Sequence, residues 1–128
     1  MAAVGTYYQN PALNYLLQGA TATKPSAWAL ALGAAVPTAS TFTEVGTASG
    51  YSAQTMPFPA GSAGSATNTV AATMGPFSTA VTISGAVIKD VLATAGNVIF
   101  YGSLATAATL TAGESVIFAV GSLSCSMA

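Results

Sequence analysis

Three carboxylates, Glu44, Asp90 and Glu114, are the only acidic side chains with which this chain could perform acid–base chemistry. Glycoside hydrolysis, for example, needs two carboxylates facing each other across a cleft. Glu114 follows the predicted turn at 112–113, where a solvated acid is ordinary, and Asp90 follows Lys89 at the end of a predicted strand. Glu44 lies in a Thr- and Gly-rich stretch. We therefore expect these acids to serve the fold rather than a reaction.

The other residue types give no alternative catalytic or metal-binding chemistry. The chain has no His and one Cys, Cys125, so it lacks the commonest general base and the usual zinc ligands. A nucleophilic Ser needs a base, and neither Lys24 nor Lys89 has a Ser-x-x-Lys context. The glycines form no phosphate-binding loop. The sequence predicts a protein that is not an enzyme and binds no metal or cofactor.

Low charge is the most unusual feature of the composition. Charged residues make up 4% of the chain, against roughly 25% in typical soluble domains. With a net charge of −1, little repulsion keeps copies apart. Such a surface favours a protein packed against copies of itself or a partner, although a thermally robust or secreted domain of odd composition is an alternative.

Two classes of partner are excluded by the same counts. Nucleic-acid binding requires many basic side chains, and this chain has two Lys and no Arg. A membrane-spanning helix requires about 20 apolar residues in a row; the longest candidate, 27–36, is about half that length and is followed by Pro37. Residues 1–8 lack the basic and apolar regions of a signal peptide. We expect synthesis and assembly in the cytoplasm, with no nucleic acid or membrane partner.

The N-terminal arm, 1–26, carries the single helix signal. Asn10 can cap a helix, Pro11 suits its first position and Gly19 suits the residue after its end, which predicts a helix over about 11–18. Three leucines fall on one face of this helix: Leu13, Leu16 and Leu17. Two turns are too few for independent stability, so the helix must dock onto the domain or onto a neighbouring subunit.

Tyr7 and Tyr8 precede that predicted helix and admit two interpretations. Exposed aromatic side chains often anchor interfaces, but these two could equally pack the helix onto the domain. The candidate interface is therefore Tyr7, Tyr8, Leu13, Leu16 and Leu17. Trp28 alternates with Leu30 and Leu32, which favours a core position over a sugar-stacking platform.

Residues 27–128 show short apolar alternations separated by turn residues, which is typical of strands. The predicted strands are 28–32, 51–56, 69–73, 81–88, 97–101, 109–110, 115–120 and 123–127. A loop is predicted over 57–68, a turn at 95–96, and a hairpin turn at 112–113 between the strands 109–110 and 115–120. Gly85 predicts a bulge, and Cys125 a small buried strand residue.

This pattern predicts an all-β fold, a single-domain β-sandwich or jelly-roll-like barrel over 27–128 with one short N-terminal helix.

From Trp28 onward the chain also resembles a family of small phage proteins often labelled tail fibre proteins. The resemblance rests on the order and spacing of five segments: Trp28-Ala29-Leu30-Ala31-Leu32 as a strand ending near Pro37; Glu44-Val45 with Gly50-Tyr51-Ser52-Ala53-Gln54; Gly75-Pro76-Phe77-Ser78-Thr79-Ala80; Gly96-Asn97-Val98-Ile99-Phe100-Tyr101-Gly102-Ser103-Leu104; and Leu110-Thr111-Ala112-Gly113-Glu114-Ser115 with Phe118-Ala119-Val120-Gly121-Ser122-Leu123. Ala53 stands where the family usually has Arg, and the family's Trp-Gly before the strand 81–88 is absent.

The resemblance implies a structural protein of a tailed-phage virion, without catalytic residues. A capsid decoration, or cement, protein is the leading expectation, because one compact domain suffices to bridge subunits of the major capsid protein. A tail or head fibre or adaptor component that contacts the host surface is the alternative. We expect self-association, with a trimer suggested by analogy with the threefold sites of capsids. A small carbohydrate-binding domain is a weaker hypothesis, because it would need exposed aromatic side chains.

Overall fold

A computed structural model of the chain describes residues 3–93 and 96–127. The elements in order are β1 (Ala3–Val4), α1 (Thr6–Gln18), β2 (Ala29–Gly33), the 3-10 turn η1 (Thr47–Ser49), β3 (Gln54–Thr55), β4 (Ser65–Thr67), β5 (Ala72–Met74), β6 (Val81–Lys89), β7 (Val98–Leu110), β8 (Val116–Phe118) and β9 (Ser124–Ser126). The predicted fold class, all-β in one domain with one short helix, is confirmed. The boundary between arm and domain at residues 26 and 27 stays a prediction.

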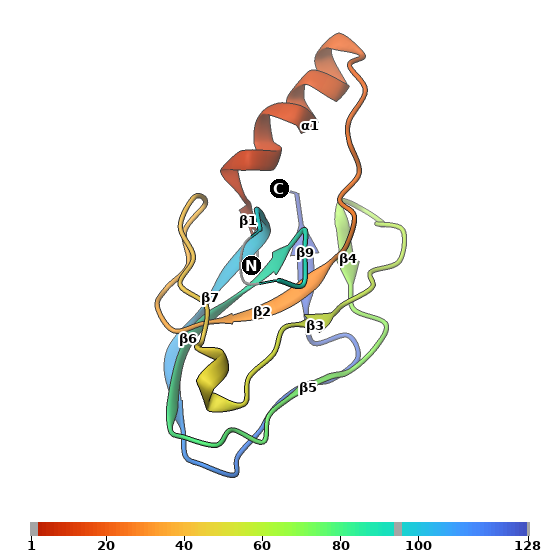
Figure 1. Ribbon diagram of the computed structural model, residues 1–128. Coiled ribbons are helices and arrows are strands. Elements are labelled where there is room, and N and C mark those ends of the chain that lie inside the picture. Colours follow the sequence, from red (N-terminus) through yellow and green to blue (C-terminus); the bar gives the residue numbers. More distant parts are fainter. Residues whose placement is uncertain (1–2, 94–95, 128) are drawn as a thin grey trace.

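The strands form one larger and two smaller antiparallel sheets (Figure 1). The five-stranded sheet has the order β1-β7-β6-β2-β3, while β4 pairs with β9 and β5 with β8. The main core combines buried side chains of the large sheet with buried side chains of the smaller sheets and the loops. Its largest members include Leu30, Leu32, Met56, Met74, Phe77 and Ile88.

Strands β6 and β7 are the centre of the large sheet, and their register is irregular in two places. The pairing shifts between Ile83 and Gly85 and again between Ile88 and Lys89. The first shift lies beside Gly85, where a bulge is predicted, but the extra residues belong to β7: residues 104–107 face the single residue Ser84 of β6. Strand β7 runs to Leu110, well beyond the predicted 97–101, because the small Ala and Thr side chains of its second half carry no hydrophobic period that sequence could reveal.

Close backbone approach explains why position 85 is a glycine. A Cβ atom built there would lie 2.6 Å from the carbonyl oxygen of Gly102 and would press on the Pro37 ring. We expect Gly85→Ala to lower the free energy of unfolding by about 1–3 kcal/mol, the usual cost of overpacking. Gly46→Ala is the matched control, because its Cβ would meet no described atom within 4 Å. Urea denaturation measures both, and equal midpoints for the two variants would contradict the close packing.

The β8 strand corrects the predicted hairpin. Residues 116–118 pair with β5, with Ala72 opposite Phe118, rather than with 109–110. The turn at 112–113 is stabilised by a bond from the Gly113 N–H to the Phe77 carbonyl, 2.8 Å, which directs the chain away from β7.

Other boundaries also differ. Strand β4 lies inside the predicted loop 57–68; the predicted strand 51–56 is reduced to β3, and 69–73 moves to β5. The predicted turn at 95–96 includes Ala95, which is outside the described residues. Strand β2 is buried at all five positions rather than on one face, because the sheet is covered on both sides there.

The helix starts earlier than predicted. Asn10 is not its cap: α1 begins at Thr6, after Gly5 in extended conformation with φ −65° and ψ 147°. Tyr7 and Tyr8 therefore lie inside the helix, and Pro11 is an interior residue rather than the first. Gly19 does end the helix, in the left-handed conformation with φ 64°, as predicted.

Candidate interaction surface

Glu44 is held by a buried ion pair. Lys89 Nζ lies 2.6 Å from Glu44 Oε2, and the lysine side chain is 1% exposed. The Tyr51 hydroxyl donates to Glu44 Oε1 at 2.9 Å and accepts from the Leu32 N–H at 2.9 Å, while Lys89 Nζ also donates to the Ala93 carbonyl at 2.6 Å. Burial raises the pKa of Tyr51; the hydrogen bond from the Leu32 N–H opposes this shift, and the Glu44 carboxylate adds to it. The network joins β2, β6 and two loops, which is a structural role.

Asp90 is held separately, at the end of β6. Its carboxylate accepts from the Asn97 backbone N–H at 2.8 Å, the Asn97 side-chain amide at 2.9 Å and the Tyr8 hydroxyl at 2.8 Å. Partial burial alone would raise the pKa of Asp90, but these donors outweigh it and the pKa lies below its usual value. Burial and the same carboxylate raise the pKa of Tyr8. The contact fixes the base of α1 to the end of the sheet.

Asp90 therefore makes stability depend on pH in the acid range. A carboxyl whose pKa is lower in the folded than in the unfolded state stabilises the fold above its unfolded pKa, about 3.9, and this contribution disappears as pH falls through the folded pKa. We expect Asp90→Asn to be less stable than the parent at neutral pH, with the difference narrowing below about pH 4. Thermal unfolding from neutral to acid pH measures this; a constant difference would contradict it.

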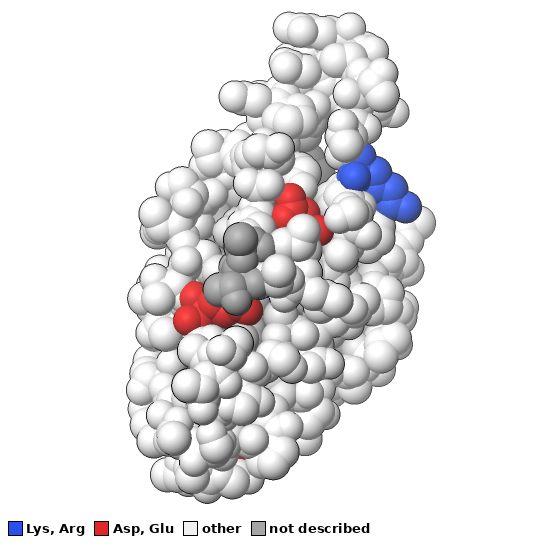
Figure 2. All heavy atoms as spheres, in the orientation of Figure 1, with Lys and Arg blue, Asp and Glu red and all other residues white. Residues whose placement is uncertain are grey.

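The remaining charges are also held within the chain. Glu114 Oε2 accepts from the Thr111 backbone N–H at 2.6 Å and the Thr111 hydroxyl at 3.1 Å, which closes the turn between β7 and β8. Lys24 Nζ lies 5.0 Å from the centroid of the half-buried Trp28 ring, a cation–π contact. Each carboxylate thus has its own set of donors, and the face in Figure 2 shows a blue patch and small red patches on an otherwise uncharged surface.

Helix α1 is fixed at its base. The Gly5 N–H donates to the Ile99 carbonyl at 2.7 Å, and the Thr6 N–H donates to the Ala39 carbonyl at 2.8 Å. These bonds replace a side-chain cap by satisfying two early N–H groups from the body of the protein. Tyr8, half-buried against the main core, adds the third attachment through its hydroxyl. The helix therefore has a defined direction relative to the sheet.

Beyond that base, α1 projects from the body, as Figure 1 shows. All of its residues are described, and none is buried. Apart from Tyr8, its large apolar side chains are exposed by half or more: Tyr7 61%, Leu13 52%, Tyr15 58%, Leu16 68% and Leu17 79%. The helix contains no charged residue. Soluble proteins rarely leave a contiguous apolar surface in water unless it binds something, so this apolar arm is the candidate interaction surface.

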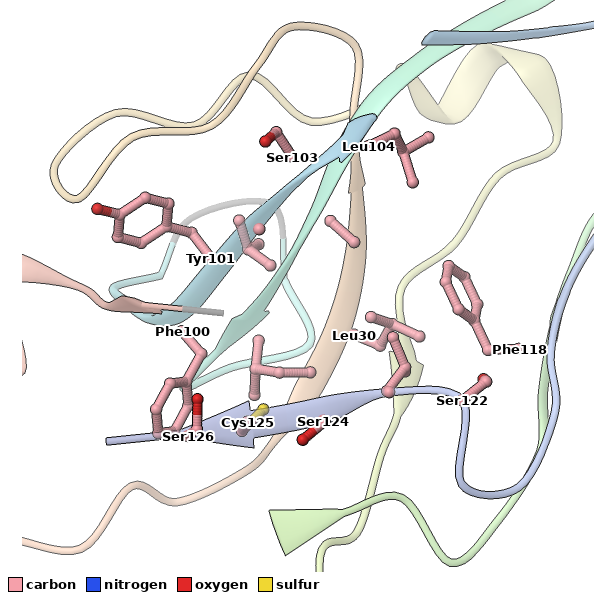
Figure 3. Close-up of a pocket in the computed structure, with 15 residues that line it drawn as sticks. Leu30, Phe100, Tyr101, Ser103, Leu104, Phe118, Ser122, Ser124, Cys125 and Ser126 are labelled. Atoms are coloured by element: carbon pink, nitrogen blue, oxygen red, sulfur yellow. The ribbon is translucent and has the colours of Figure 1, made fainter. Parts of the chain in front are cut away.

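A second apolar feature is a groove between the large sheet and β9, with a volume of about 410 Å³ (Figure 3). Its apolar lining includes Leu30, Ile88, Phe100, Leu104, Phe118 and Leu123. Serines of β9 and the preceding turn stand beside it. Cys125 lies in its floor, buried as predicted, and burial raises the pKa of this thiol to about 11, so the thiol is protonated at neutral pH.

One family comparison identifies the class of protein. The model of a family described as Podophage GP4 fiber I protein gp80 matches residues 3–126 of the chain. The chain belongs to this family. No curated protein matches it. The family description confirms the resemblance to phage fibre proteins and makes this chain a structural, virion-associated protein of a bacteriophage.

Phage fibre families are generally structural rather than enzymatic. Among residues 3–93 and 96–127, no three or more metal-ligating His, Cys, Asp or Glu side chains come together. No helix in the same part of the chain is long and apolar enough to cross a membrane.

The structure separates the residues of the predicted interface. Tyr7, Leu13, Leu16 and Leu17 are exposed on α1, whereas Tyr8 packs the helix onto the body. Their role as contacts of a partner stays a prediction. Tyr15 was missed, although it lies within the predicted helix and is as exposed as Tyr7. The groove was also missed, because its walls come from segments far apart in the sequence.

Proposed function

We propose that this chain is a non-enzymatic building block of a phage fibre, joined to copies of itself or to neighbouring virion proteins through helix α1. The observation that carries the proposal is the anchored base and exposed apolar surface of α1. A rigid arm of this kind loses little conformational freedom on docking, because its direction is already set by the bonds to Ile99, Ala39 and Asp90.

The near absence of charge supports a permanent contact with other virion proteins. It does not favour a reversible association that is accelerated by electrostatic attraction. Contacts that bury neutral surface lose little strength with salt, and no unpaired charge has to be removed from water along α1. The fibre role ranks first because the family description names a fibre.

Decoration of the capsid is the second candidate. A single compact domain with no extended shaft in its described part suits a protein that bridges shell subunits. In that case the major capsid protein would be the partner of α1. Both roles place the protein in the virion, after assembly in the host cytoplasm.

The copy number of the chain per purified particle distinguishes the fibre role from capsid decoration. Quantitative mass spectrometry against the major capsid protein gives the number, and antibody labelling of particles gives the position. We expect a small number of copies at the tail or at discrete appendages. A count comparable with that of the shell protein, with label over the whole head, would overturn the fibre role in favour of decoration.

A further inference from the structure

We propose that residues 3–18 of one copy dock on a second copy, at the place that the same residues occupy on their own chain. Strand β1 and helix α1 then pass from one body to the next, and the copies are joined by exchanged arms. This inference deepens the proposed function, on which it rests, by naming the partner of the arm. The receiving site is present in the structure, because each body holds an arm there.

The first residues of the arm make its contacts with the body. Strand β1 pairs with β7, the Gly5 N–H donates to the Ile99 carbonyl at 2.7 Å, and the Tyr8 hydroxyl donates to Asp90 at 2.8 Å. Among the described residues, no hydrogen bond joins residues 9–18 to any residue beyond position 20. The attachment is therefore a short segment, 3–8, and the rest of α1 is a projection from it.

The receiving site fits this short segment closely. A Cβ atom on Gly5 would collide with the Val98 carbonyl, and Tyr8 packs against the main core. A second copy offers the same backbone groups and the same place for Tyr8, so every contact of residues 3–8 forms again without change. Exchange of an identical element between copies is for this reason a low-cost route to an assembly.

The projecting part of α1 packs little against the chain that returns from it. Residues 20–27 run back to β2 without secondary structure (Figure 1). A cleft of about 520 Å³ lies between α1 and this return segment, with helix residues on one wall and return-segment residues on the other. At the tip, the Ala20 N–H donates to the Asn14 carbonyl at 3.3 Å. Moving the helix away from the return segment therefore gives up few contacts.

Gly19 is the hinge at which the arm opens. It has φ 64°, and a Cβ atom there would meet no described atom within 4 Å, so no neighbour holds it and a glycine adopts other conformations at low cost. Helix α1 is about 20 Å long, and residues 20–27 reach about 26 Å when extended. An arm opened at Gly19 is therefore long enough to reach the receiving site of an adjacent copy.

The leucine ridge of α1 supplies the driving force for exchange. Leu13, Leu16 and Leu17 have the i, i+3, i+4 spacing that makes a ridge on one side of a helix, and each is exposed by at least half in the single chain. Reciprocal exchange about a twofold axis places two α1 helices side by side in opposite directions between the bodies. The two ridges then pack against each other and leave the water.

A disulfide across the β1–β7 pair distinguishes exchanged arms from arms on their own chains. Ala3 lies opposite Tyr101, and the Cα atoms of antiparallel partners are about 4.5–5.5 Å apart, which a disulfide can bridge. The test chain carries Ala3→Cys and Tyr101→Cys, with Cys125→Ala to remove the native thiol. Oxidised at a concentration series, it should shift from monomer to covalent dimer on a non-reducing gel. Disulfides within single chains, or free thiols, would overturn the inference.

Two single variants exclude chance cross-links. Chains with Ala3→Cys and chains with Tyr101→Cys, both in the Cys125→Ala background and refolded together, should form disulfides between different chains. Ile117→Cys replaces Tyr101→Cys in the control mixture, because position 117 is 68% exposed and pairs with β5 rather than with β1. Equal yields of cross-linked dimer from the two mixtures would count against exchange, because they would come from random collision.

A shorter return segment should favour exchange. The Ser26 hydroxyl donates to the carbonyl of the residue that also receives the Tyr8 hydroxyl, so the return segment must cover the rise of α1 from Tyr8 to Gln18, about 15 Å. Deletion of residues 20–23 leaves positions 19 and 24–26 for this distance, at most about 14 Å. Short hinges promote exchange. We expect the deletion chain to dimerise at least about tenfold more tightly than the parent in sedimentation equilibrium.

The control for the deletion keeps the length of the return segment. A chain with Thr21→Ser and Thr23→Ser should dimerise like the parent. A deletion chain that stays monomeric at all concentrations, or that unfolds, would show that the arm cannot dock on a second copy.

These results are independent of the proposed function, which depends on copy number and position in the particle. Fibre placement together with arms held on their own chains would leave the function intact and assign α1 to a different virion protein. Shell-wide placement would overturn the fibre role whichever body receives the arm.

Discussion

Lys89→Met is expected to lower the free energy of unfolding by about 3–5 kcal/mol, because it leaves the Glu44 carboxylate buried without its counter-ion. The lysine is 1% exposed and its Nζ lies 2.6 Å from Glu44. Methionine keeps most of the apolar stem, so the loss reports the unpaired charge rather than a cavity. Chemical denaturation of parent and variant, followed by circular dichroism, measures the difference.

A double variant tests the cause of that loss. Lys89→Met combined with Glu44→Gln removes both charges and keeps an acceptor for the Tyr51 hydroxyl. We expect it to be more stable than Lys89→Met alone, since buried ion pairs replaced by neutral groups often cost little. Lys24→Met, at an exposed position, should change stability by less than about 1 kcal/mol. A double variant no more stable than the single one would show that the lysine acts through its packing.

The sequence predicts this fold where the evidence is local. The alternation in 81–88 suffices to predict strand β6, the glycine at 85 marks the place where its pairing with β7 becomes irregular, and Gly19 marks the end of the helix. Prediction fails where a backbone group far away in the sequence determines where an element begins or which strand it pairs with. The helix starts at Thr6 because carbonyls of Ala39 and Ile99 satisfy the chain there, and β8 pairs with β5 rather than with its neighbour in sequence.

The candidate site, like the fold, could be predicted from the sequence only in part. The leucines of α1 are visible in the sequence because helical spacing places them on one side. The ion-pair partner of Glu44 is not visible in the sequence, because Lys89 lies 45 positions away and no motif links the two residues. The groove depends on how β7, β8 and β9 lie relative to one another, which residue types alone do not determine. Low charge, which reflects the whole surface rather than one contact, led us to expect packing against copies of the chain or a partner, and this stays a prediction.

Replacing the leucine ridge of α1 is expected to remove the protein from the particle without unfolding it. In a variant with Leu13→Ser, Leu16→Ser and Leu17→Ser, three side chains that are at least half exposed become polar, so the fold loses little buried area. Docking, in contrast, loses its apolar anchors, and hot-spot residues of this kind dominate binding. We expect incorporation into phage particles, measured by quantitative mass spectrometry, to fall at least about tenfold.

The control must change apolar exposure elsewhere by a similar amount. A variant with Val36→Ser, Val70→Ser and Ile117→Ser alters three positions exposed by 63%, 50% and 68% outside α1, and it should be incorporated like the parent. Equal melting temperatures for parent, ridge variant and control would show that folding is not the reason for any loss. Normal incorporation of the ridge variant would contradict the arm hypothesis and transfer the contact to the body of the domain. Tyr8 still anchors the helix in the ridge variant, so α1 keeps its position on the domain. The incorporation measurement therefore tests the exposed surface of α1 and not the position of the helix.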